Sequence, residues 1–146
     1  MRIIPLMFLA TVLALAGTAL RAADQTGVRA MLVIASNQRG ASDPKLAAYE
    51  PTLRSILRFE SYRLAGSGSA ALSSGKSSID LGHGHSLILE AEPANGKGVG
   101  LRVRWEDGGR TLMNTGLSLR GGVPAVLGGP STGKEGEVWA VIIVAN

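Results

Sequence analysis

The 146-residue chain contains no cysteine, and aromatic residues make up only 4% of it. Without cysteine there is no disulfide framework, no thiol chemistry and no thiol through which the chain could be tethered to a membrane. The five aromatic residues beyond position 23 are mostly accounted for by predicted core positions, which argues against a stacking platform for sugars or nucleic-acid bases. They are Tyr49, Phe59, Tyr62, Trp105 and Trp139.

The sequence lacks apolar runs long enough to cross a membrane, and its most apolar stretch lies at the start. Met1-Arg2 is followed by an apolar stretch at residues 6–16 and by small residues at 17–23. This order is typical of a signal peptide, with cleavage after Ala19, Ala22 or Ala23, and the apolar stretch is too short for a membrane span. We expect residues 1–23 to be a signal peptide and residues 24–146 a single exported domain, periplasmic or secreted. An uncleaved membrane anchor is the alternative.

Charge of one sign is not concentrated anywhere in the sequence. The formal net charge is +4, and it falls to +2 without residues 1–23, which carry Arg2 and Arg21. The remaining basic residues are spread along the chain, whereas a nucleic-acid-binding domain usually has a concentrated basic face. We therefore expect no nucleic-acid partner.

Residues 86–127 have the alternating pattern of antiparallel strands joined by glycine turns. Pairing Leu87 with Trp105, Leu89 with Val103 and Ala91 with Leu101 places six apolar side chains on one face, because side chains alternate along a strand. A slip of one residue would turn all of them toward water.

Two further hairpins are predicted after the first. A loop at residues 107–109 would set Trp105 opposite Thr111 and Val103 opposite Met113. A Gly121-Gly122 turn would then pair the strand that ends near Leu119 with one around Val126, with Pro124 limiting the pairing.

The two ends of the exported domain supply unbroken apolar strands. Residues 28–36 and 138–145 show no alternation and are expected to be covered on both faces. Between them, Asp43-Pro44 begins a helical segment that Pro51 divides or kinks before Phe59. The Gly- and Ser-rich residues 66–78 predict a weak strand or a mobile loop. The expected fold is mainly β, a sandwich or half-barrel of seven or eight strands with one short helical segment after the first strand.

Residues 114–129 resemble a hairpin near the end of the secretin domain of bacterial type II and III secretion channels. In both, a strand containing threonine leads through a glycine turn, here Gly121-Gly122, to an apolar strand that ends in Gly128-Gly129. The resemblance covers about 16 residues. It implies an envelope-associated β domain, and no functional residue is carried over.

The only histidines, His83 and His85, form the candidate metal site. Residues two apart on an extended segment share a face, so both imidazoles would be able to hold Zn or Cu with Asp80 or Glu90 as a further ligand. The neighbouring glycines favour the alternative, an exposed turn without a metal.

Other motifs do not support an enzyme. Residues 128–134 match the first part of the phosphate-loop spacing, but Glu135 stands where a Ser or Thr must reach magnesium, and a strand follows where a helix is needed. Glu90 and Glu92 are explained as solvated charges opposite Arg102. We predict a non-enzymatic domain of the bacterial envelope, without a cofactor, that contacts a protein partner or pairs with itself through an edge strand. A small-ligand or metal-binding domain using His83 and His85 is the alternative.

Overall fold

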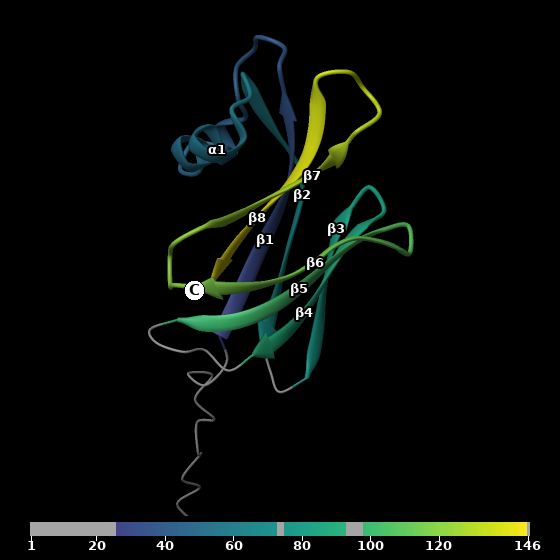
Figure 1. The fold of residues 1–146 in the computed structure, drawn as a ribbon. Coiled ribbons are helices and arrows are strands. Elements are labelled where there is room, and N and C mark those ends of the chain that lie inside the picture. Colours follow the sequence, from purple (N-terminus) through teal and green to yellow (C-terminus); the bar gives the residue numbers. More distant parts are fainter. Residues whose placement is uncertain (1–25, 73–74, 93–97, 146) are drawn as a thin grey trace, which may run out of the picture.

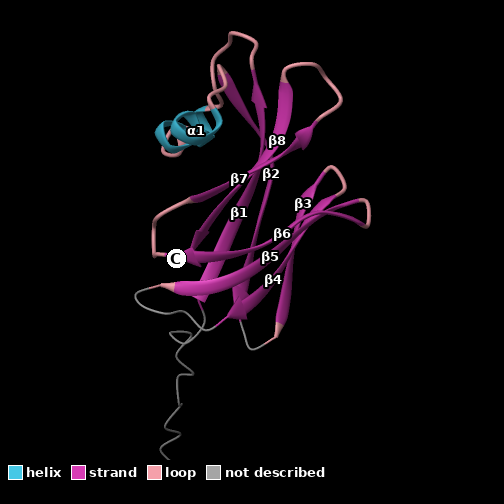
Figure 2. Ribbon diagram, viewed as in Figure 1, coloured by secondary structure: helices cyan, strands magenta, loops and turns pink. Residues whose placement is uncertain are grey.

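The chain forms a β-sandwich of two four-stranded antiparallel sheets (Figures 1 and 2). The computed structural model describes residues 26–72, 75–92 and 98–145. Sheet A contains β2 (Ser61–Leu72), β1 (Thr26–Ser36), β8 (Glu137–Ala145) and β7 (Ala125–Ser131), in that order. Sheet B contains β3 (Lys76–Gly82), β4 (His85–Glu92), β5 (Val99–Asp107) and β6 (Arg110–Leu119), in that order. The expected fold class is confirmed, whereas the predicted signal peptide lies outside the described residues.

The first and last strands pair at the centre of sheet A. β1 and β8 run antiparallel with Val28 opposite Ala145 and Val33 opposite Ala140. Most of their apolar side chains are buried, on both faces, since the odd positions of β8 face sheet B and the even ones face the helical segment. This arrangement explains why neither strand alternates between apolar and polar residues.

A short helical segment covers the outer face of sheet A. The 3₁₀ turn η2 (Pro44–Leu46) begins at Asp43, whose side chain accepts a hydrogen bond from the Lys45 amide, and α1 (Glu50–Leu57) follows. Leu46 and Leu53 are fully buried against the sheet. Of the expected alternatives, a divided or a kinked helix, the structure has the divided one, but the break falls at residues 47–49 and Pro51 lies in the first turn of α1. Ile56 of α1 is 52% exposed.

Sheet B is the predicted meander, and the register of its first hairpin is confirmed. Leu87 lies opposite Trp105, Leu89 opposite Val103 and Ala91 opposite Leu101. Five of these six side chains are buried between the sheets, whereas Ala91 is exposed. Glu90 faces Arg102 on the outer face.

The predicted register of the second hairpin is wrong. Trp105 lies opposite Met113 and Val103 opposite Thr115, because the turn uses only Gly108-Gly109 and β6 bulges at its start. Both glycines have positive φ, 57° and 85°, as a type I′ turn requires. From Met113 onward the shift is two residues, so these side chains keep their predicted faces, whereas Thr111 lies opposite Glu106 and is exposed.

The predicted third hairpin is also wrong. β6 and β7 belong to different sheets, and β7 pairs with β8. The chain crosses between the layers around Gly122, whose amide donates to the carbonyl of Ala145. Pro124, which has no amide hydrogen to offer a ladder, precedes the first residue of β7.

Of the two predictions for the Gly- and Ser-rich run, a weak strand or a mobile loop, the strand is confirmed: the run belongs to β2 up to Leu72 and to β3 from Lys76. Its glycines let β3 approach β2 closely. A Cβ at Gly66 would overlap the carbonyl oxygen of Leu81, and one at Gly68 would press on Ile79. The composition therefore reflects a tight contact between the edges of the two sheets.

We expect Gly66→Ala to lower the free energy of unfolding by about 3 kcal/mol, the upper part of the usual cost of overpacking. The reason is that backbone of β2 or β3 must move to admit the methyl group. Urea unfolding measures the effect. Gly121→Ala is the control, because a Cβ there meets nothing within 4 Å. Equal stability of the two variants would contradict the close approach.

Candidate functional site

The two histidines lie at the tip of the β3–β4 hairpin, on different parts of the turn. His83 and Gly84 have φ of 53° and 79°, so they are the central residues of a type I′ turn, and His85 is the first residue of β4. The extended geometry on which the metal prediction depends is therefore absent. His83 is exposed, as predicted for a turn, whereas His85 is only 1% exposed.

His85 is held between two tryptophans at one end of the core. Trp105 Nε1 donates a hydrogen bond of 2.9 Å to His85 Nδ1, and the Trp139 ring lies 4.6 Å from the imidazole, centroid to centroid. Since Nδ1 accepts, the proton of the neutral ring is on Nε2. Nε2 faces Asp107 Oδ2 at 3.9 Å. Burial lowers the pKa of His85 below its ordinary value of 6.5; Asp107 opposes this shift and His83 adds to it.

His83 ties the hairpin tip to β2. Its Nε2 lies 3.1 Å from the carbonyl oxygen of Ala65, which accepts, so Nε2 carries the proton. The His83 ring is 5.9 Å from that of Trp139, so both histidines flank the same indole.

These hydrogen bonds occupy most of the imidazole nitrogens that a metal would need as ligands. A metal needs an imidazole nitrogen with a free lone pair. Only His83 Nδ1 has one here, because His85 Nδ1 accepts from Trp105 and Nε2 of each ring carries the proton. Among the residues that the structure describes, no three His, Asp or Glu side chains cluster to hold an ion. Metal binding by His83 and His85 stays a prediction, and it requires His85 to give up its hydrogen bond with Trp105.

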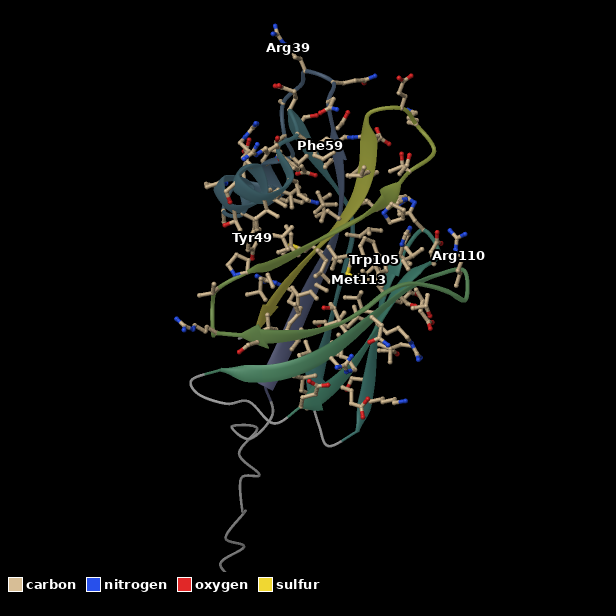
Figure 3. The ribbon with its side chains drawn as sticks, viewed as in Figure 1. Arg39, Tyr49, Phe59, Trp105, Arg110 and Met113 are labelled. Carbon is tan, nitrogen blue, oxygen red and sulfur yellow. The ribbon has the colours of Figure 1, made fainter. Side chains whose placement is uncertain are left out.

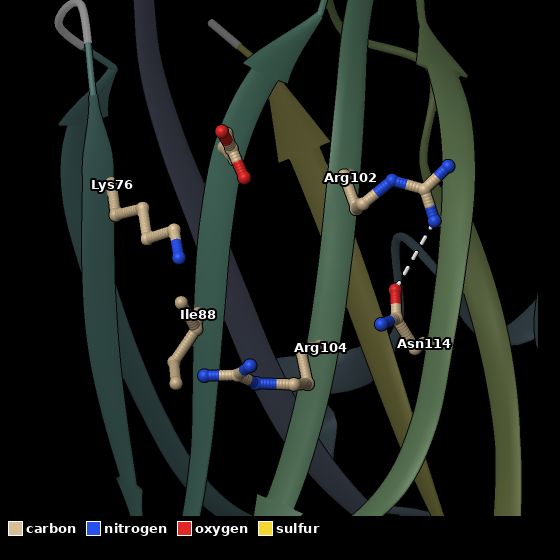
Figure 4. Close-up of a pocket in the computed structure, with 6 residues that line it drawn as sticks. Lys76, Ile88, Arg102, Arg104 and Asn114 are labelled. Carbon is tan, nitrogen blue, oxygen red and sulfur yellow. Dashed lines mark hydrogen bonds between the residues drawn. The ribbon is translucent and has the colours of Figure 1, made fainter.

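The outer face of sheet B carries the paired carboxylates of the sequence analysis. Glu92 accepts a hydrogen bond of 2.7 Å from Arg102, whose other arm donates to Asn114. A shallow cavity of about 80 Å³ lies beside them (Figure 4). Lys76, Ile88, Glu90, Arg102, Arg104 and Asn114 line it. Cations and carboxylates alternate across the strands here, as expected for a solvated sheet face.

Residues 128–134 form the end of β7 and the turn toward β8. A Cβ at Gly129 would overlap the ring of Trp105. The glycine pair that resembles a phosphate loop therefore makes room for the central tryptophan.

Sequence reasoning missed the partners of His85. Trp105 and Trp139 were assigned only to the core, and Asp107 only to a turn. The alternation of β5 and the type I′ turn place Trp105 and Asp107 beside His85 on the neighbouring strand. Trp139 comes from the other sheet, and no sequence signal places it there.

No known protein family, curated protein or solved structure matches the chain. No helix within residues 26–72, 75–92 and 98–145 is long and apolar enough to cross a membrane. The resemblance of residues 114–129 to a secretin hairpin stays a prediction.

We expect stability to fall in mild acid through His85. Above pH 6.5 the ring is neutral in the folded and unfolded chains; below it, the unfolded chain binds a proton that the folded chain excludes, because its pKa is lowered. Between the pKa of His85 in the folded chain and its pKa in the unfolded chain, the free energy of unfolding falls by at most about 1.4 kcal/mol per pH unit. Urea unfolding at about pH 7.5 and pH 5.5 measures it.

His85→Gln is the test variant, because its side-chain oxygen still accepts from Trp105 but does not titrate. It should remove most of the acid-dependent loss. His83→Gln should retain most of it, because burial, the main cause of the lowered pKa of His85, is unchanged and the His85–Trp105 hydrogen bond stays in place. A loss of equal size in His85→Gln and the unmodified protein would refute the assignment to His85.

The hydrogen bonds of the histidines also predict that Zn²⁺ leaves the thermal midpoint unchanged. A ligand that binds only the folded state raises the midpoint, and here His85 would first have to break its hydrogen bond with Trp105. Differential scanning fluorimetry with and without Zn²⁺ measures this. A zinc-dependent rise that disappears in both His83→Ala and His85→Gln would instead establish the two-histidine site.

Proposed function

We propose that the chain is an exported, non-enzymatic domain of the bacterial envelope that acts by contact with another protein, through the open edge of β6. The observation that carries this proposal is the unequal covering of the four sheet edges. An uncovered strand edge offers a row of backbone donors and acceptors to another strand.

Three of the four edges are covered or short. β2 and β3 lie against each other, with Ser77 donating to the carbonyl oxygen of Ala71 and His83 bonding Ala65. β7 has seven residues, contains Pro130 and contacts α1.

β6 differs from the other edges in length and composition. It has ten residues, no proline and one charged residue, Arg110, at its beginning. Among the described residues, its only strand partner is β5. Exposed edges usually carry charges or prolines that prevent pairing, and such features are scarce here apart from the bulge near its start.

Gly116 is the second feature that supports pairing at β6. A glycine within a strand weakens it unless something approaches closely. A Cβ at Gly116 would meet no atom closer than 3.8 Å, so packing within the described chain does not require this glycine. The close approach of a partner strand to β6 would explain why position 116 is glycine.

The edge is tested by photocrosslinking in the native envelope. A benzophenone amino acid replaces Ser118, which is exposed on β6, or, as the control, Ser78, which is exposed on β3. We expect a protein adduct from position 118 only. A heterologous adduct identifies a partner, and an adduct with a second copy identifies pairing between chains.

Gly116→Glu should reduce the adduct at least about tenfold, because a closely opposed charge disfavours strand addition. A Cβ at this position has room, with Glu92 Oε2 at 3.8 Å and Arg102 Nη2 at 3.9 Å. Ser78→Glu adds the same charge to β3 and should leave the adduct unchanged. Equal adducts from positions 118 and 78, or none, would contradict the proposal.

A further inference from the structure

A groove on the outer face of sheet A, beside the helical segment, is independent of the β6 edge. It lies where η2 and the residues before α1 pass over β1 and β2, and its volume is about 350 Å³, within the range of small-molecule sites. Arg29, Met31, Lys45, Ala48, Tyr49, Leu64 and Ser67 line it. Figure 3 shows Tyr49 below α1.

The walls of the groove are apolar. Met31, only 6% exposed, and the half-buried Leu64 come from the sheet, and Ala48 and the Tyr49 ring come from the helical segment. A hydrocarbon chain laid here would lose its contact with water against these side chains, which favours binding roughly in proportion to the apolar area covered.

The polar groups of the groove all donate hydrogen bonds, and none of its lining residues is acidic. Arg29 donates to the Tyr49 hydroxyl oxygen at 2.7 Å, which leaves the hydroxyl hydrogen to point at a ligand. Lys45 and Ser67 add an ammonium group and a second hydroxyl.

Among the described residues, the two cations of the groove have no salt-bridge partner, as is also true of Arg39, Arg58, Arg110 and Arg120, whereas four other arginines are paired. Arg54, Arg63, Arg102 and Arg104 each lie within 3.1 Å of a glutamate oxygen. Within the described residues, neither Arg29 nor Lys45 has a carboxylate at salt-bridge distance. Two unpaired cations beside apolar walls complement a molecule that combines a hydrocarbon chain with one anionic head.

We propose that this groove binds a medium-chain fatty acid, with its carboxylate at Arg29, Lys45 and Tyr49 and its alkyl chain along Met31 and Leu64. An extended peptide fits less well. β1 is paired on both sides and β2 lies against β3, so no free strand edge is present in the groove to bond a peptide backbone.

Calorimetric titration with dodecanoate, below its micelle concentration, tests the proposal. One molecule should bind per chain, and dodecanol should bind at least about tenfold more weakly, because it cannot make charge-assisted hydrogen bonds. Arg29→Gln and Lys45→Gln should each weaken dodecanoate binding about tenfold. Both residues are exposed, so the fold should persist, which circular dichroism checks.

Two further variants separate the groove from a general attraction of anions. Ala48→Trp should abolish binding by filling the groove, whereas Lys76→Gln, on the other sheet, should leave it unchanged. Equal affinity for dodecanoate and dodecanol, or an equal effect of Lys76→Gln, would overturn the proposal. Tighter binding of dodecyl phosphate, or of a short peptide with apolar residues and a free carboxyl end, would overturn the assignment to a fatty acid.

Discussion

The pairing of β1 with β8 is the constraint on which the rest of the structure depends. These strands lie at the two ends of the described chain, yet they form nine consecutive residue pairs at the centre of sheet A. Their apolar side chains project from both faces, so each face needs a cover. Sheet B supplies one cover, and η2 with α1 supplies the other. Because such a long-range pairing closes almost the whole chain into a loop, its entropic cost must be balanced by the burial on both faces.

The two sheets of the sandwich make close contact along one pair of edges, β2 and β3, and little contact along the other pair, β6 and β7. On one side, Gly66 and Gly68 let β2 and β3 touch, and the turn at His83 is bonded to Ala65, so the sheets meet almost as in a barrel. On the other side the chain crosses between the sheets only once, and β6 and β7 have few contacts with each other. The helical segment spans only part of sheet A. The open edge and the groove therefore result from how this small chain covers a core exposed on two faces.

The sequence predicted those features that depend on alternation or on a local signal. The faces of β4 and β5 follow from single-residue alternation, and the beginning of η2 follows from Asp43-Pro44. The second hairpin was misjudged because a bulge on β6 and a two-residue turn change the pairing without changing the faces. The third was misjudged because Gly121-Gly122 suits a hairpin turn as well as a crossing between sheets. The crossing is favoured over the hairpin because β7 pairs with the free side of β8 in sheet A, and this depends on the whole fold and not on the local sequence.

The same limit applies to the histidine site. Spacing identified His83 and His85 as neighbours, but the chemistry of an imidazole depends on what each nitrogen contacts. Trp105 occupies Nδ1 of His85, and Trp139 reaches the ring from the opposite sheet. The indole donor makes the neutral ring the favourable form, because a proton on Nδ1 would face the Trp105 N–H group. A histidine in this position joins the tips of two hairpins to the core. The contribution of His85 to the free energy of unfolding therefore depends on pH, and this dependence requires no bound ligand.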